Sequence, residues 1–128
     1  MKNIKVIDAN IILRYLLDDN EELSRKARDL VDQAIGLKIE ILIKEIVIAE
    51  VVYVLEKFYK VNRKEIADVL ERLISLRGIK TENKEFVKRA LKIYSEKKLD
   101  FVDCILCAMG EDYHIETFDK KLKRCISG

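Results

Sequence analysis

The stretch that decides the fold reads Ile46-Val47-Ile48-Ala49-Glu50-Val51-Val52-Tyr53-Val54-Leu55. Apart from Glu50 it is apolar on every side, which predicts an element that is buried all round. Its continuation from Lys44 to Tyr59 covers about four turns, and this length favours a helix despite the many β-branched residues. The central carboxylate must be paired, protonated or bound to a metal ion, because an isolated buried charge is unstable by several kcal/mol.

Short apolar runs alternate with helical patterns on both sides of this stretch. Strands are predicted at Ile4–Ile7, Ile39–Ile43, Ile79–Lys80 and Ile115–Phe118. Two further helices are predicted at Ala9–Leu17 and Glu21–Ile35. Three more are predicted to begin after the capping residues Asn62, Asn83 and Asp100. The alternation predicts one α/β domain over residues 1–128, a three-layer α/β/α arrangement with a central, mostly parallel sheet of four to five short strands.

Composition excludes some classes of protein. The net charge of +2 does not by itself indicate a nucleic-acid or membrane partner. No apolar segment reaches the roughly 18 residues of a membrane span, and the first residues lack a signal peptide, so a cytoplasmic protein is expected. Three cysteines are an odd number, which argues against a disulfide framework. Cys104 and Cys107, in an apolar helix, are predicted to be small core residues.

Four acids share one property, which is that each adjoins a predicted strand or an apolar helix: Asp8, Glu50, Asp103 and Asp119. Asp8 and Asp119 directly follow predicted strands, so a parallel sheet would place both at its carboxyl edge, where ligands bind. Carboxylates that meet repel one another unless a cation or protons neutralise them. Oxygen ligands without histidine or cysteine suit Mg²⁺ or Mn²⁺, and such a site can support displacement at phosphate.

Each of these acids also has a structural explanation. Asp8 and Asp119 could cap the helices that follow them, and Asp103 could serve as a first-turn acid favoured by the helix dipole. Glu50 could pair with a lysine or arginine of the core. Capping is the first assignment for Asp100.

Other chemistry finds little support. His114 is the only histidine, which disfavours a Ser-His-Asp or Cys-His hydrolase, and no Gly-rich nucleotide-binding loop is present. Basic residues form two clusters, whose default explanation is a solvated surface: Lys57, Lys60, Arg63 and Lys64, and Lys120, Lys121, Lys123 and Arg124. The second cluster follows Asp119 directly and would place cations where a phosphodiester approaches an acidic pocket.

Four blocks of the chain together resemble PIN-domain nucleases. They are Val6–Leu13, Ile48–Leu55, Asp100–Ala108 and Thr117–Leu122. Their order and spacing fit the family over the whole chain, whereas each block alone would be a weak signal. The cysteines at 104 and 107 replace the small residues usual in the third block.

The resemblance implies a Mg²⁺- or Mn²⁺-dependent endoribonuclease of the VapC type, the toxin of a toxin–antitoxin pair. It implies an RNA substrate, a small antitoxin protein as partner, and a homodimer. It carries over Asp8, Glu50, Asp103 and Asp119 as catalytic and metal-binding residues. Asn10, Thr117 and Asp100 match supporting positions, and the first two would orient ligands or water.

Three other functions compete with this expectation. A catalytically silent PIN-like module would bind RNA or protein without cutting. A phosphate-accepting receiver domain needs two acids after its first strand, and a haloacid-dehalogenase-like phosphatase needs Asp-x-Asp. Asp8-Ala9-Asn10 offers one acid, which disfavours both.

Overall fold

The structure, a computed structural model, describes residues 3–128 of the chain. Strands and helices alternate through the first two thirds of the described chain, and helices alone follow. The elements are β1 (Ile4–Val6), α1 (Ala9–Leu17), α2 (Glu21–Ile35), β2 (Glu40–Ile43), α3 (Glu45–Lys57), α4 (Arg63–Ile74), β3 (Ile79–Thr81), α5 (Lys84–Glu96), α6 (Phe101–Met109) and α7 (Lys120–Ser127).

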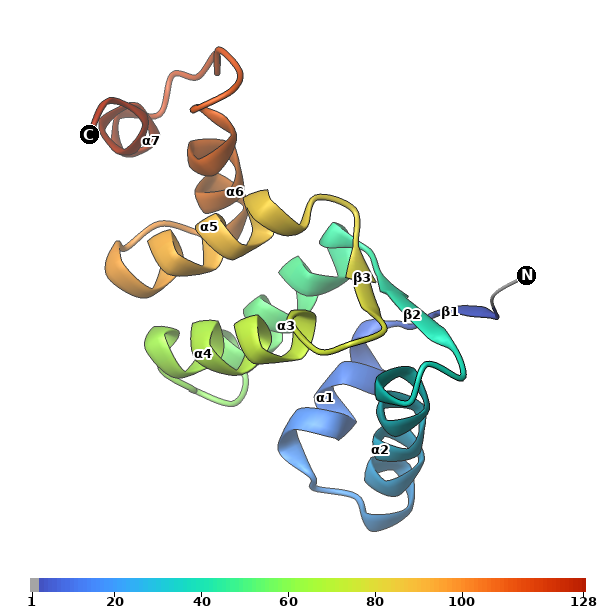
Figure 1. The fold of residues 1–128 in the computed structure, drawn as a ribbon. Coiled ribbons are helices and arrows are strands. Elements are labelled where there is room, and N and C mark those ends of the chain that lie inside the picture. The colour runs from blue at the N-terminus through green and yellow to red at the C-terminus, as the bar shows by residue number, and fades with distance from the viewer. Residues whose placement is uncertain (1–2) are drawn as a thin grey trace.

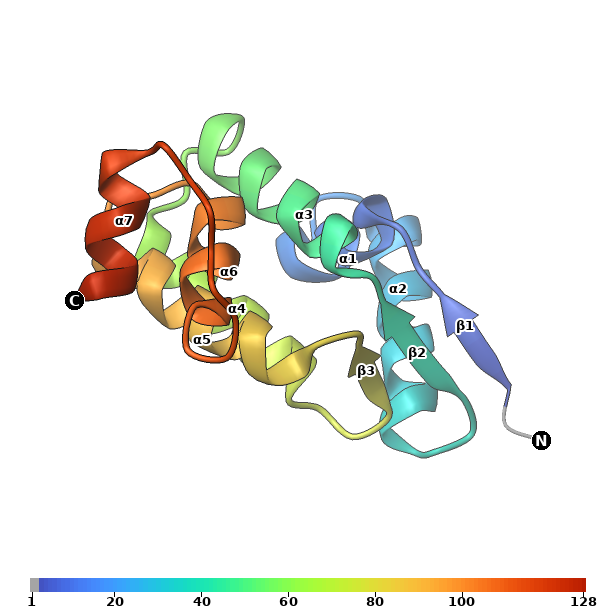
Figure 2. The same cartoon turned by 90° about the horizontal axis from the view of Figure 1, so that it is seen from above.

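The three strands form a parallel sheet in the order β1-β2-β3 (Figure 2). Ile41 of β2 pairs with Ile79 of β3, and both side chains are buried. Residues of α1, α2 and α4 pack on this face, where Ile12, Val31 and Leu73 surround a small gap with Ile43 and Ile79. The expected parallel α/β architecture is therefore confirmed, with β2 at its centre.

The predicted number of strands is wrong for the described residues. Ile115–Phe118 forms no strand, and Phe118 is fully exposed. β1 is therefore an edge strand of the described sheet, and its Ile4 and Val6 are 58% and 64% exposed. A strand of four residues gains its hydrogen bonds only from a paired neighbour, and this segment lies instead in the connection between α6 and α7.

The three-layer sandwich is also incomplete. Helices α5, α6 and α7 pack on α4, on α3 and on one another, and they extend away from the sheet (Figure 1). A disulfide between Cys107 of α6 and Cys125 of α7 holds these two helices together. Because the cross-linked residues flank Ile115–Phe118, the segment returns to α6 and does not run beside β1.

The prediction that α3 is buried all round is wrong. One side of the helix enters the core through Ile48, Val51, Val52 and Leu55. The opposite stripe is open, with Ile46 77% exposed, Tyr53 57% exposed, and Glu50 between them. Residues 46, 50 and 53 share one face because they are about one helical turn apart. Glu50 is therefore not the isolated buried charge that the sequence indicated.

The cysteines differ from the prediction as well. Cys107 is not a free core residue, because it forms the disulfide with Cys125. Cys104 remains a free, buried thiol, and burial raises its pKa to about 12. The odd number of cysteines thus leaves one over after a single cross-link. Among residues 3–128, no helix combines the length and the apolar character needed to cross a bilayer.

Candidate acidic site

Two acids lie at the start of α6. Asp100 occupies the N-cap position, as predicted, but its side chain makes no capping bond. Asp103 lies in the first turn and is half-buried. Both residues line a cavity of about 420 Å³ between α3 and α6, together with Tyr53, Glu56 and Lys57. The two carboxylates therefore face a space that a ligand can enter.

Asp103 carries the clearest electrostatic signature of these acids. Burial is the largest cause that raises the pKa of its carboxyl group, followed by the negative charges of Asp119 and Asp100. Like charges that approach one another favour protonation or a bound cation. The three acids are thus electrostatic neighbours, although Asp119 lies on another helix.

Asp119 caps α7, as one of the alternatives predicted. Its Oδ1 accepts a hydrogen bond of 2.9 Å from the backbone N–H of Leu122. The backbone N–H of Asp119 in turn donates to Thr117 Oγ1 over 3.0 Å. These bonds fix the Asp119 backbone and occupy one carboxylate oxygen. Thr117 therefore orients an acidic residue of the candidate site.

Asp8 and Glu50 do not line the cavity that Asp100 and Asp103 line. Asp8 caps α1, since its Oδ1 accepts a bond of 3.1 Å from the backbone N–H of Ile11. With Asn10 it lines a different cavity, of about 370 Å³, beside β1. Glu50 lies on the exposed stripe of α3, and no ion pair to it is found among residues 3–128. Neither carboxylate contributes to the raised pKa of Asp103.

The donor chemistry and the geometry give different answers about a metal ion. Carboxylate oxygens are suitable ligands for Mg²⁺ or Mn²⁺, and the negative charges of Asp119 and Asp100 add to burial in raising the pKa of Asp103. Within the described part of the chain, however, no three His, Cys, Asp or Glu side chains gather closely enough to hold an ion. Mg²⁺ keeps several of its waters and is usually held by one or two carboxylates, so Asp103 together with Asp119 or Asp100 would be enough to hold it.

Glu56, Arg63 and Tyr94 form a polar cluster next to this cavity, which was not predicted from the sequence. Arg63 is no surface cation. Its Nε donates to the carbonyl of Tyr94 over 2.9 Å, and its Nη2 donates to the carbonyls of Lys97 and Leu99. Glu56 accepts from the hydroxyl of Tyr94 and from Arg63 Nη1.

These contacts hold the segment that leads into Asp100. The hydrogen bond from Tyr94, ahead of the charges of Arg63 and Lys57, lowers the pKa of Glu56. A signal was present in the sequence, because Tyr94 lies on an apolar helical stripe and a buried phenol needs a polar partner. Its partner could not be named, since Glu56 is on another helix.

Comparison with known proteins agrees with the four sequence blocks. The PIN domain model matches residues 5–125. A protein of Aquifex aeolicus (strain VF5) described as "VapC ribonuclease" is 28% identical over 134 residues, which cover 94% of this chain and 91% of that protein. No solved structure matches the chain. With nearly its whole length matched by the family model, the chain belongs to the PIN domain family.

Proposed function

We propose that this protein is a divalent-metal-dependent endoribonuclease that hydrolyses RNA phosphodiester bonds. The observation that carries the proposal is the raised pKa of Asp103, which burial and the charges of Asp119 and Asp100 produce at the wall of a cavity. Perturbed carboxylates in a cleft are typical of functional sites. The "VapC ribonuclease" relative and the PIN domain family support the same activity.

The proposed site residues are Asp8, Glu50, Asp103 and Asp119, supported by Asn10, Thr117 and Asp100. Asp103 and Asp119 are the two whose charges already interact. The proposed cofactor is Mg²⁺ or Mn²⁺, which when bound supplies positive charge to the phosphate and an activated water. Thr117 holds the backbone of Asp119, and Asp100 adds negative charge beside Asp103.

The experiment separates metal binding from cleavage. Mn²⁺ is titrated into the protein by calorimetry without RNA, and cleavage of RNA is then followed with Mn²⁺, with Mg²⁺ and with EDTA. We expect binding and cleavage by the wild type, and a loss of more than about 100-fold in rate for Asp103→Asn and for Asp119→Asn. Asp29→Asn, an exposed acid on α2, is the control. Equal cleavage by all four proteins would refute the proposal.

Asp8→Asn and Glu50→Gln test the two proposed site acids that do not line the cavity of Asp103. If both belong to the site, each lowers the rate with little change in thermal stability, because asparagine at position 8 caps α1 about as well as aspartate. Full activity of either variant would remove that residue from the proposed set.

We further propose that the protein is the toxin of a type II toxin–antitoxin pair, acting on RNA in the cytoplasm as a homodimer and held inactive by a small antitoxin. The relative's name supports this assignment. Expression in a bacterial host should stop growth, and the Asp103→Asn variant should not. A reading frame for a small protein beside the gene should restore growth when co-expressed.

One observation favours a second function. Because no three potential ligands gather among residues 3–128, a PIN-like module that binds RNA without cutting it also fits. RNA affinity that needs no metal, without turnover under any metal condition, would support this second function.

A further inference from the structure

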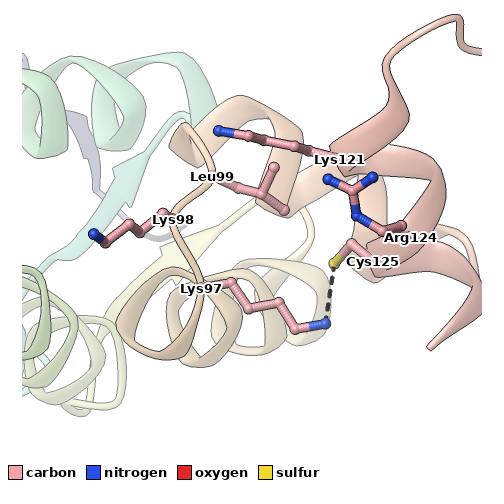
Figure 3. A pocket seen from close by; sticks show the side chains of 6 residues that line it. All are labelled: Lys97, Lys98, Leu99, Lys121, Arg124 and Cys125. Carbon is pink, nitrogen blue, oxygen red and sulfur yellow. Dashed lines mark hydrogen bonds between the residues drawn. The ribbon is translucent and has the colours of Figure 1, made fainter.

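Four of the six residues that line a cavity beside the acidic site are basic. It has a volume of about 450 Å³ and lies between α7 and the segment that joins α5 to α6. We call it the cationic cavity, and its lining residues are Lys97, Lys98, Leu99, Lys121, Arg124 and Cys125. Figure 3 shows Lys97, Lys121 and Arg124 around Leu99, whereas Lys98 extends to the other side of its segment.

The cations that line this cavity have no carboxylate partner among the described residues. Among residues 3–128, no carboxylate forms an ion pair with Lys97, Lys98, Lys121 or Arg124, and Lys97 Nζ lies 3.9 Å from Cys125 Sγ, a weak acceptor. Elsewhere in the part of the chain that the structure describes, four of the seven other arginines pair with acids, as Arg14–Asp19, Arg28–Asp18, Arg63–Glu56 and Arg89–Glu111. Like charges around one hollow repel one another, and an anion in the hollow relieves that repulsion.

Both walls of the cationic cavity are fixed from behind. Arg63 donates to the carbonyls of Lys97 and Leu99, which holds the first wall. The disulfide from Cys125 to Cys107 ties α7, the second wall, to α6. Leu99 is buried and gives the cavity an apolar floor. A site whose walls are already fixed loses less conformational entropy when a ligand binds.

Each wall also continues into the acidic site. Lys97–Leu99 lead directly into Asp100, and Lys121 follows the cap residue Asp119 on the first turn of α7. A nucleic acid whose scissile phosphate lies at Asp103 and Asp119 therefore passes close to these cations. Arg124 is suited to such a ligand, because a guanidinium can donate two parallel hydrogen bonds to one phosphate.

We propose that the cationic cavity binds a backbone phosphate of the RNA next to the one that is cleaved. This inference rests on the proposed ribonuclease function and adds a substrate-binding subsite to it. Lys121 and Arg124 are the principal ligands, with Lys97 on the opposite wall. They hold the strand in register with the acids and take no part in breaking the bond.

The first test measures binding alone, on the full chain. A fluorescein-labelled single-stranded oligoribonucleotide of mixed sequence is titrated by fluorescence anisotropy, in EDTA and over a range of salt concentrations. The variant is Lys121→Gln with Arg124→Gln. The control is Lys120→Gln with Lys123→Gln, which removes the same charge from the same exposed helix without touching the cavity lining.

We expect the cavity variant to bind about tenfold more weakly and to lose about 0.7 from the slope of log affinity against log salt for each phosphate contact removed. The control should change affinity by less than about twofold. Equal effects in both variants would show diffuse surface charge and overturn the proposal. So would competition by polyglutamate as effective as competition by RNA of equal charge, since that result assigns the cavity to an acidic protein.

A second test uses cleavage and keeps the two proposals distinguishable. For an RNA that the wild type cuts, the cavity variant should raise KM with little change in kcat, because the contact is made equally in the ground and transition states. Cleavage with an unchanged KM would overturn the subsite alone. Absence of cleavage in the wild type, with the binding difference retained, would overturn the ribonuclease and leave the phosphate site.

Discussion

The guanidinium carbon of Arg63 lies 3.7 Å from the centre of the Tyr94 ring. The same guanidinium donates to the carbonyls of Tyr94, Lys97 and Leu99 and to Glu56. One side chain thus joins α4 to the end of α5 and to the segment before Asp100. A fork of donors with fixed geometry makes this possible.

Replacing Arg63 by alanine should therefore destabilise the fold. We expect a loss of about 2–3 kcal/mol in the free energy of unfolding, because Glu56 and the loop carbonyls lose their donors. Arg63→Lys should recover little, since an ammonium cannot reproduce the fork. Urea denaturation measures the difference, with the exposed neighbour Lys64→Ala as control. A change in Arg63→Ala no larger than that of Lys64→Ala would contradict the assignment.

Glu56 should make stability depend on pH in the acid range. Its pKa is lowered in the folded state, first by the hydrogen bond from Tyr94. A depressed carboxyl pKa stabilises the fold above the ordinary value of 4.5, and the contribution disappears as pH falls through the folded value. In Tyr94→Phe the fall in stability between neutral and acid pH should be smaller than in the wild type. An unchanged pH profile would show that the bond contributes nothing.

Asp119→Asn should lower the pKa of Asp103. The substitution removes one of the two negative neighbours, while burial, the largest cause of the shift, remains. The pKa should therefore move toward its ordinary value of 3.8 without reaching it. Carboxyl ¹³C NMR titration measures this change directly, and Asp29→Asn should leave the pKa unaltered. If the pKa of Asp103 is the same in Asp119→Asn as in the wild type, the two carboxylates do not interact.

Asp103 should also lower stability at neutral pH. A raised carboxyl pKa stabilises the fold below the unfolded value, and this contribution is lost as pH rises through the folded value. Asp103→Asn should therefore raise the free energy of unfolding at pH 7 and give no gain at pH 3, while activity disappears. Thermal denaturation at both pH values is the measurement. A destabilised variant at pH 7 would indicate that Asp103 has a structural partner.

Gly78 and Gly36 provide a matched pair for the packing of α2 beside β3. Gly78 has φ of +79°, and a Cβ there would lie 2.1 Å from the carbonyl oxygen of Ala34. Gly78→Ala should cost about 3 kcal/mol or more through backbone strain and steric overlap. At Gly36 the nearest atom to a Cβ is 3.4 Å away, so Gly36→Ala should be neutral or slightly stabilising. Chemical denaturation measures the free energy of unfolding of both variants. Equal changes in Gly78→Ala and Gly36→Ala would contradict this packing.

The Cys107–Cys125 cross-link should contribute to stability. It closes a loop with a sequence separation of 18, for which chain entropy predicts about 3 kcal/mol. A reducing agent should therefore lower the melting temperature of the wild type. It should leave Cys107→Ser with Cys125→Ser unchanged, since this double variant has no disulfide to reduce. Identical melting of the oxidised and reduced wild type would show that the cross-link does not constrain the unfolded chain.

Local patterns in the sequence predicted six of the seven helices found among residues 3–128 and the positions of all three strands, whereas α7 was expected only as a turn that Asp119 could cap. Asn20 and Asn62 accept hydrogen bonds from Leu23 and Glu65 and begin α2 and α4, as their capping positions predicted. The strands at Ile4–Val6, Glu40–Ile43 and Ile79–Thr81 lie where short apolar runs were found. Such features depend on residues within about one helical turn, or on alternation along a strand, so they can be found without a partner.

Only the tertiary structure decided which acids meet and which apolar stretches are covered. The sequence indicated Asp8, Glu50, Asp103 and Asp119 by residue type and position. In the structure, the acids whose charges raise the pKa of Asp103 are Asp119 and Asp100. Whether Ile115–Phe118 becomes a strand depends on the position of α7, and the disulfide ties α7 to α6. Contacts between distant residues depend on how whole elements pack, and no local pattern along the chain encodes that packing.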